Sequence, residues 1–261
     1  MRPKSNATRI VQRAAITIFS IVSPALAQNL VLNSDFEQGP GFFASTLTYS
    51  PGLGGSGKYD LRPDPEGWNS QFAACRDHSF VGNRRMMVID GYGGANNLFW
   101  QEQFDVQPHT RYGIRLWTVT LTALAPPNTP ALVVRVFHLL PTPVTHQDFP
   151  VAPLNPAADC VWRSIQFVWN SDTATRAQLT LINTVGAVIG NDFAMDDVEF
   201  IPLCAGDVDG DFGVNEVDLG ILLANWGLSV APNTSGDLNG DGVVSEPDLG
   251  TLLGNWQCTT P

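Results

Sequence analysis

Hydrophobic and polar residues alternate over several short stretches between residues 28 and 203. The clearest stretch is 112–120, which is rich in aromatic and β-branched residues. Similar stretches occupy 86–89, 98–106, 131–139, 161–169, 177–182 and 194–201. Turn-forming Gly, Pro and Asn residues separate them and no helical period appears, so the pattern predicts an antiparallel β-sandwich or jelly roll. The Gly-rich stretch 40–67 predicts a surface excursion.

The end of the chain carries a different pattern, and it occurs twice. Residues 206–226 and 236–256 are identical at 13 of 21 positions, which indicates duplication of one unit. Each copy ends in apolar residues at the spacing i, i+3, i+4, i+7, which predicts one apolar helical face. These residues are Leu219, Leu222, Leu223 and Trp226 in the first copy and Leu249, Leu252, Leu253 and Trp256 in the second. The fold class is therefore predicted as mainly β, with a small helical module at the end.

Residues 1–27 have the pattern of a secretory signal peptide, with a basic start, a short apolar middle and Ala-Leu-Ala at the end. A membrane anchor would need about 20 apolar residues, and this run is roughly half as long. We therefore expect cleavage after Ala27 and a secreted protein. No later stretch is long and apolar enough to span a membrane.

Charge divides the rest of the chain at Cys204. Residues 204–261 contain seven Asp and two Glu but no Lys or Arg, a net charge of −9, whereas 28–203 hold 16 acids and ten bases. We therefore predict two domains, 28–203 and 204–261. Such an acidic chain is unsuited to bind nucleic acid or an anionic membrane.

The four cysteines are Cys75, Cys160, Cys204 and Cys258. An even number in an exported chain favours disulfides, and three pairings are open from sequence alone. The pairing of Cys75 with Cys160 and of Cys204 with Cys258 keeps each bridge within one predicted domain.

The two repeats have the composition of calcium-binding loops. Ca²⁺ takes six to eight oxygen ligands, and a twelve-residue loop supplies them from positions 1, 3, 5, 7, 9 and 12, with Gly at position 6. The first loop offers Asp207, Asp209, Asp211, the Gly213 carbonyl, Asn215 and Asp218. The second loop offers Asp237, Asn239, Asp241, the Val243 carbonyl, Ser245 and Asp248.

Position 6 distinguishes the two loops. Gly242 meets the requirement for a sharp turn in the second, whereas Phe212 stands there in the first. A left-handed conformation costs a non-glycine residue roughly 1–2 kcal/mol. We therefore expect the first loop to bind calcium more weakly.

This arrangement, with Asp at position 12 and no full entering helix, resembles the type I dockerin. The matching residues are Asp207, Asp209, Asp211, Val214, Asn215, Asp218 and Leu219, and Asp237, Asn239, Asp241, Gly242, Val244, Asp248 and Leu249. The resemblance implies calcium binding and docking to a cohesin module, often in assemblies that degrade polysaccharide. Loop positions 10 and 11 depart from the family, with Glu216-Val217 and Glu246-Pro247 where dockerins often have Ser/Thr-type pairs. The basic residues common on dockerin helices are also absent.

Residues 28–203 resemble the galactose-binding-like jelly roll of carbohydrate-binding modules, through 29–37, Gly67-Trp68, 100–108 and 192–198. The resemblance implies a structural calcium between the first and last strands, for which Glu37 and Asp196 are the matching candidates. The alternative is that these two acids face solvent. Among the aromatic residues, Tyr59 and Trp68 lie in loop-like sequence and are the candidates for stacking on a sugar.

No catalytic residue is predicted. Glycoside hydrolysis needs two carboxylates about 5–10 Å apart, and scattered acids such as Glu66, Glu102 and Asp148 cannot be paired from sequence. The sequence thus favours a secreted noncatalytic protein whose calcium-dependent tail docks a polysaccharide-binding sandwich to a cohesin-like partner. A divergent glycoside hydrolase with the same tail, and a structural extracellular protein, are the alternatives.

Overall fold

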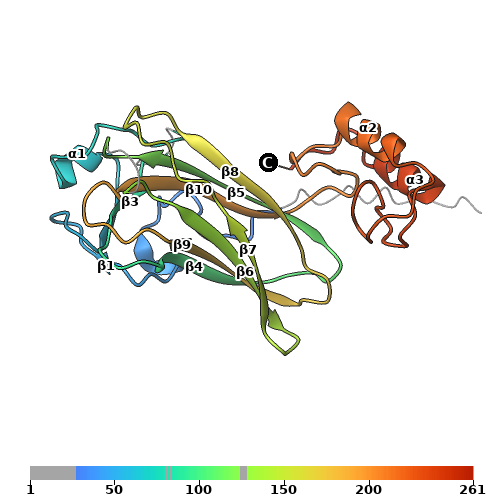
Figure 1. Ribbon diagram of the computed structural model, residues 1–261, viewed down its shortest axis with the longest axis horizontal. Helices are drawn as coiled ribbons and strands as arrows, with labels where there is room; N and C mark the ends of the chain where they lie inside the picture. Colours follow the sequence, from blue (N-terminus) through green and yellow to red (C-terminus); the bar gives the residue numbers. More distant parts are fainter. Residues whose placement is uncertain (1–27, 80–81, 83, 124–127, 261) are drawn as a thin grey trace, which may run out of the picture.

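The computed structural model describes residues 28–79, 82, 84–123 and 128–260. Within them a two-sheet β-sandwich precedes a small helical tail (Figure 1). Strands β1 to β10 span, in order, Thr48–Tyr49, Lys58–Arg62, Met86–Asp90, Asn97–Asp105, Arg111–Thr120, Leu132–Leu140, Thr145–Pro150, Arg163–Asn170, Arg176–Asn183 and Phe193–Pro202. The helices are the 3-10 turn η1 (Pro40–Phe42), α1 (Pro65–Trp68), α2 (Glu216–Ala224) and α3 (Glu246–Gly254). The predicted signal peptide lies outside the described residues.

One sheet has six strands in the order β1-β2-β3-β10-β5-β8, and the other has four in the order β4-β9-β6-β7. All neighbours are antiparallel except β1 and β2. The alternation of the strands explains this arrangement, because inward residues such as Ile114 and Leu116 are fully buried between the sheets. The predicted sandwich is therefore confirmed.

The Gly-rich stretch 40–67 is more ordered than predicted. It contributes β1 and β2, and Tyr59 and Leu61 of β2 are buried in the main core. The prediction of a surface excursion is therefore wrong for β2. A second small core lies outside the main one, where Trp68 and Phe72 pack with Cys75.

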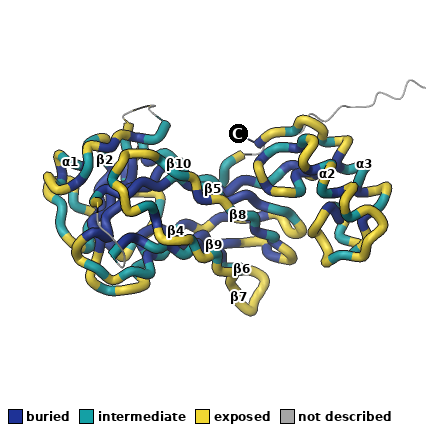
Figure 2. Tube along the Cα trace, turned by 45° about the horizontal axis from the view of Figure 1, so that its top comes forward, coloured by how far each residue is buried: buried dark blue, intermediate teal, exposed yellow. Residues whose placement is uncertain are grey.

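The tail has its own core, visible as a separate group of buried residues in Figure 2. Val214, Leu222, Val244 and Leu252 are at most 2% exposed. The predicted apolar helical face is only half correct. Leu223 and Leu253 are each 52% exposed, and Trp226 and Trp256 lie beyond the helix ends.

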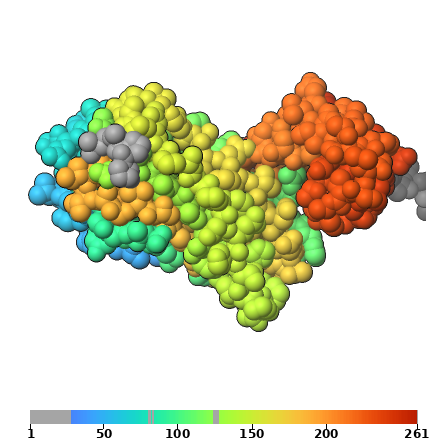
Figure 3. Space-filling model, in the orientation of Figure 1, coloured from blue at the N-terminus to red at the C-terminus, as the bar shows by residue number. Residues whose placement is uncertain are grey.

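Both disulfides follow the predicted pairing that keeps each bridge within one domain. Cys75 is bonded to Cys160 within the sandwich, and Cys204 to Cys258 within the tail. The second bridge joins the two ends of the tail, which appears as a distinct lobe against one end of the sandwich in Figure 3. No helix of the described residues is long and apolar enough to cross a membrane.

Candidate calcium loops and ligand-facing surface

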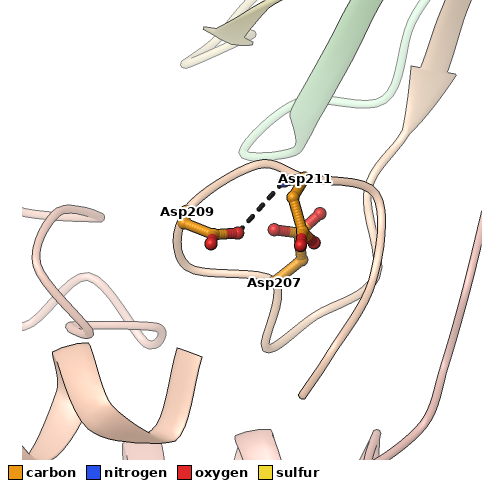
Figure 4. A group of neighbouring side chains, drawn as sticks. All are labelled: Asp207, Asp209 and Asp211. Atoms are coloured by element: carbon orange, nitrogen blue, oxygen red, sulfur yellow. Dashed lines mark hydrogen bonds between the residues drawn. The ribbon is translucent and has the colours of Figure 1, made fainter. Parts of the chain in front are cut away.

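The first loop brings three carboxylates together. Oxygen atoms of Asp207, Asp209 and Asp211 all lie within 4.8 Å of one another, and the side chains point into the same loop (Figure 4). Asp207 is fully buried, and the Asp211 amide donates to the Asp209 carboxylate at 3.1 Å. Burial, and to a smaller extent the charge of nearby Asp218, raises the pKa of Asp207 to about 6, against the lowering effect of the Gly210 amide and Arg111. A hard cation that took these oxygens as ligands would relieve this clustering of negative charge.

The position-12 residue closes the first loop and starts the helix. Asp218 Oδ1 accepts from the amides of Val208 at 2.6 Å and Asp209 at 3.2 Å. Its other oxygen accepts from the Asn215 amide at 2.8 Å, and the Asn215 side chain accepts in return from the Asp218 backbone, as well as from the Val217 amide. This exchange is a capping box, so loop closure and the start of α2 depend on the same carboxylate.

The second loop repeats this geometry thirty residues later. Asp248 Oδ1 accepts from Leu238 at 2.8 Å and Asn239 at 3.1 Å, and Oδ2 accepts from Ser245 at 2.8 Å. Asp237 accepts from Gly240 and from the position-6 amide, as Asp207 does in the first loop. The second loop differs in having Asn239 in place of a third acid, and its side chain donates to Asp241 at 3.0 Å.

Position 7, which is expected to supply a carbonyl ligand, has the same setting in both loops. Gly213 forms an isolated β-bridge with Thr259, and Val243 forms one with Ser229. In each loop the amide of the position-7 residue donates at 2.9 Å to the carboxylate at position 5: Gly213 to Asp211, and Val243 to Asp241. The predicted loop residues are thus brought together in two equivalent sets, and their oxygen-rich chemistry fits Ca²⁺.

Phe212 adopts the left-handed conformation predicted for position 6. Its φ is 76°, close to the 84° of Gly242. Phe212 is only 4% exposed, because its ring packs against the sandwich and is not part of the tail core.

The two candidates for a sandwich calcium take different partners. Glu37 accepts from the Arg85 amide at 2.7 Å. Asp196 is fully buried, accepts from the His78 amide at 3.2 Å, and lies beside the equally buried Asp77. Burial and the hydrogen bond with Asp77 raise the pKa of Asp196 well above its usual range. Asp196 therefore does not face solvent, in contrast to the alternative considered from sequence.

Tyr59 and Trp68 do not have the exposed faces expected of sugar-stacking residues. Tyr59 is 6% and Trp68 1% exposed, and the Trp68 indole donates to the Ser50 carbonyl at 2.7 Å. Both residues are core residues, and their predicted role in ligand stacking is at odds with this burial.

A different surface has the chemistry of a ligand site. An open groove of about 410 Å³ lies beside β4 and β9. It is lined by Leu32, Gly41, Phe42, Phe43, Ala44, Gln101, Glu102, Gln103 and Gln178. Gln103 donates to the Gln178 side chain at 2.8 Å, and Gln178 donates to Gln101 at 3.1 Å.

Glu102 is the one acidic residue among those lining the groove. It is 8% exposed, and its Oε1 accepts from the Leu32 amide at 3.0 Å. Within the described residues its Oε2 has no hydrogen-bond partner. Burial raises the pKa of Glu102 to about 7. This setting depends on the pairing of β4 with β9, which local sequence patterns do not reveal.

Comparison with known proteins identifies the tail. Residues 205–253 match the dockerin type I domain, so the tail contains a dockerin type I domain. No curated protein matches the chain.

Solved structures resemble the sandwich at low sequence identity. The CBM22-1 xylan-binding domain from Paenibacillus barcinonensis Xyn10C is 14% identical, with 68% of this chain and 97% of that one covered and a TM-score of 0.43. A family 16 carbohydrate-binding module is 15% identical, with 66% and 99% covered and a TM-score of 0.40. The enzymatically active domain of bacteriophage CBA120 tailspike protein 4 is 12% identical, with a TM-score of 0.41. There 66% of this chain is covered, but only 21% of the tailspike chain.

Proposed function

We propose that this is a secreted, noncatalytic protein that binds a polysaccharide through its sandwich and docks to a cohesin module through its calcium-loaded tail. The observation that carries the proposal is the pair of equivalent acidic loops within the dockerin match, each closed by an Asp at position 12. The two disulfides and the dockerin domain are typical of an extracellular protein.

The helices offer a docking surface with internal symmetry. Leu223 and Leu253 occupy equivalent positions of α2 and α3 and are equally exposed, at 52%. Trp226 and Trp256 follow them at 39% and 37% exposure. Exposed aromatic and aliphatic side chains are common at protein interfaces. The cohesin partner is expected to cover these residues.

Calcium-dependent capture by cohesin modules tests this docking. The full chain should bind at least one module of a cohesin panel in calcium and none in chelator. Leu223→Glu with Leu253→Glu should reduce binding more than tenfold. Leu53→Glu is the matched control, because Leu53 is an exposed leucine of the sandwich. Equal binding by both variants would contradict the proposed surface, and silence across a broad panel would contradict a cohesin partner.

The groove beside β4 and β9 is the proposed polysaccharide site. The side chains of Gln101, Gln103 and Gln178 supply neutral donors and acceptors, which suit sugar hydroxyls. Phe42 is 38% exposed at the edge and offers an apolar surface for a sugar ring. The unpartnered oxygen of Glu102 adds a further hydrogen-bonding position.

Affinity electrophoresis against a panel of soluble polysaccharides tests this site. Gln103→Ala combined with Gln178→Ala should weaken retention at least tenfold. Gln71→Ala is the control, because Gln71 is exposed but lies outside the groove. Retention that is unchanged by the double substitution would place the ligand elsewhere, and no retention by any polysaccharide would favour the purely structural alternative.

The second candidate function is glycoside hydrolysis. The pKa of Glu102, raised to about 7 by burial, suits a general acid. Hydrolysis needs a second carboxylate about 5–10 Å away, and the groove lining supplies only Glu102. Hydrolysis of a polysaccharide by the wild-type chain, lost in Glu102→Gln, would support this candidate over the noncatalytic one.

A sandwich calcium at Glu37 and Asp196 is a separate part of the proposal. The support is the burial of Asp196 beside Asp77, two acids for which a cation would be a favourable neighbour. Calcium bound by the wild-type chain should exceed that bound by Asp196→Asn by one ion, as measured by equilibrium dialysis. Equal amounts would contradict this site.

A further inference from the structure

The first calcium loop contacts the sandwich directly. The Arg111 guanidinium on β5 donates to the carbonyl oxygens of Asp207 and, at 3.1 Å, of Val208. Gln166 on β8 donates to the Gly210 carbonyl. Backbone atoms within the ligand-bearing part of the loop are therefore held by two neighbouring strands.

Phe212 packs against β5 of the sandwich. The Arg115 guanidinium carbon lies 4.4 Å from the centre of the Phe212 ring. A Cβ atom on Gly113 would come within 2.6 Å of Phe212 Cζ and 2.7 Å of a Leu203 methyl group. Only glycine at residue 113 leaves the space that the ring occupies.

The second loop lacks this contact, although its backbone is equivalent. A Cβ on Gly242 would meet the Val230 carbonyl of the tail itself at 3.6 Å. Position 6 therefore follows the usual glycine rule in the loop where this position faces the tail itself, and departs from it in the loop where its side chain contacts the sandwich. Burial of the phenyl ring against the sandwich offsets the strain of its left-handed backbone.

We infer that the first loop fastens the tail to the sandwich, so that calcium binding at this loop fixes the position of one domain relative to the other. Asp207 connects the two events. Its carboxylate is a predicted calcium ligand and accepts from the Phe212 amide at 3.1 Å, while its carbonyl accepts from Arg111. Ordering of Asp207 by the ion therefore orders the residue that contacts Gly113. This role is independent of the identity of the glycan and of the docking partner.

Small-angle X-ray scattering of the full chain tests the inference. The wild-type chain should have a smaller radius of gyration and a shorter maximum dimension in calcium than in chelator. Phe212→Gly removes the anchor but keeps a residue suited to the turn. Gly113→Ala fills the space from the sandwich side and leaves the loop sequence intact. In calcium, both variants should have a larger radius of gyration and maximum dimension than the wild-type chain.

Gly220→Ala is the control, because a Cβ at this exposed helical glycine would meet nothing within 4 Å. Its scattering should match that of the wild-type chain. Calcium titration shows whether Phe212→Gly still loads the first loop, and thermal unfolding shows whether Gly113→Ala keeps a folded sandwich. Wild-type dimensions in either folded, calcium-loaded variant would overturn the inference, as would wild-type dimensions that do not respond to calcium.

Discussion

Asp248 accepts a hydrogen bond from the amide of Leu238, ten residues earlier, at 2.8 Å. The same carboxylate accepts from the Ser245 amide and so caps α3. Each calcium loop is thus closed by the residue that starts its helix, and Asp218 has this position in the first copy. The helices of the tail are therefore expected to depend on their loops.

Replacement of Asp248 by Ala should destabilise the tail more than replacement of Glu246, the exposed acid two residues earlier. Loss of the cap alone costs about 1 kcal/mol, and loss of a calcium ligand adds to it. Helical circular dichroism during urea unfolding in calcium measures the difference. Equal midpoints for Asp248→Ala and Glu246→Gln would contradict the proposed closure.

In the isolated tail, residues 204–261, the second loop should bind calcium more tightly than the first. Without the sandwich, the left-handed conformation of Phe212 is strained by roughly 1–2 kcal/mol, which corresponds to about a tenfold weaker affinity. Isothermal titration of the Asp207→Ala variant with calcium measures the affinity of the second loop. Titration of the Asp237→Ala variant measures the affinity of the first loop. Tighter binding by Asp237→Ala than by Asp207→Ala would show that the strain is not the deciding difference.

Glu102 should make the sandwich less stable as pH rises. Its pKa is raised to about 7 in the folded chain by burial, from an ordinary value of 4.5. Below pH 4.5 both states hold the proton. As pH rises to about 7, the unfolded chain releases its proton first, so the free energy of unfolding falls by about 3 kcal/mol.

Glu102→Gln should remove this part of the pH dependence between pH 4.5 and 8, measured by urea unfolding of the sandwich. Glu216→Gln, a substitution at an exposed acid of the tail, is the control and should leave the slope unchanged. A wild-type slope in Glu102→Gln would mean that another group is responsible.

The Cys75–Cys160 disulfide should contribute on the order of 4 kcal/mol to the stability of the sandwich, because it closes a long loop of the unfolded chain. Cys75 of this bridge also belongs to the second small core, which contains Trp68 and Phe72. The sandwich of the Cys75→Ser, Cys160→Ser variant should therefore unfold at a lower denaturant concentration than that of the wild-type chain, as measured by near-ultraviolet circular dichroism. Removal of Cys204 and Cys258 should leave that transition unchanged, and the opposite ranking would contradict this assignment.

Local patterns predicted much of this architecture. Seven of the strands follow stretches of alternating residues, and the spacing of the Asp residues predicted which side chains share each loop. Residues whose setting depends on distant partners were not predictable in this way. Trp68 lies in loop-like, Gly-rich sequence. In the structure its indole donates a hydrogen bond to the Ser50 carbonyl, and its ring is buried in the second small core.

The same limit applies to the candidate sites. Gln103 and Gln178 lie opposite each other only because β4 pairs with β9 in one register. The sequence shows that Phe212 departs from the rule for position 6, but the reason is Gly113, on a strand far earlier in the chain. Side-chain periodicity carries no information about such contacts.

Calcium is expected to fold the tail. The full chain with Cys204→Ser and Cys258→Ser tests this most directly, because no disulfide then holds the tail ends together. Each loaded site should stabilise the tail by about 2.7 kcal/mol at a hundredfold excess of calcium over the dissociation constant. In two-dimensional amide NMR, the signals of residues 204–261 should be dispersed in calcium and collapse in chelator, with the sandwich signals still dispersed. Tail signals that stay dispersed and unshifted in chelator would contradict it.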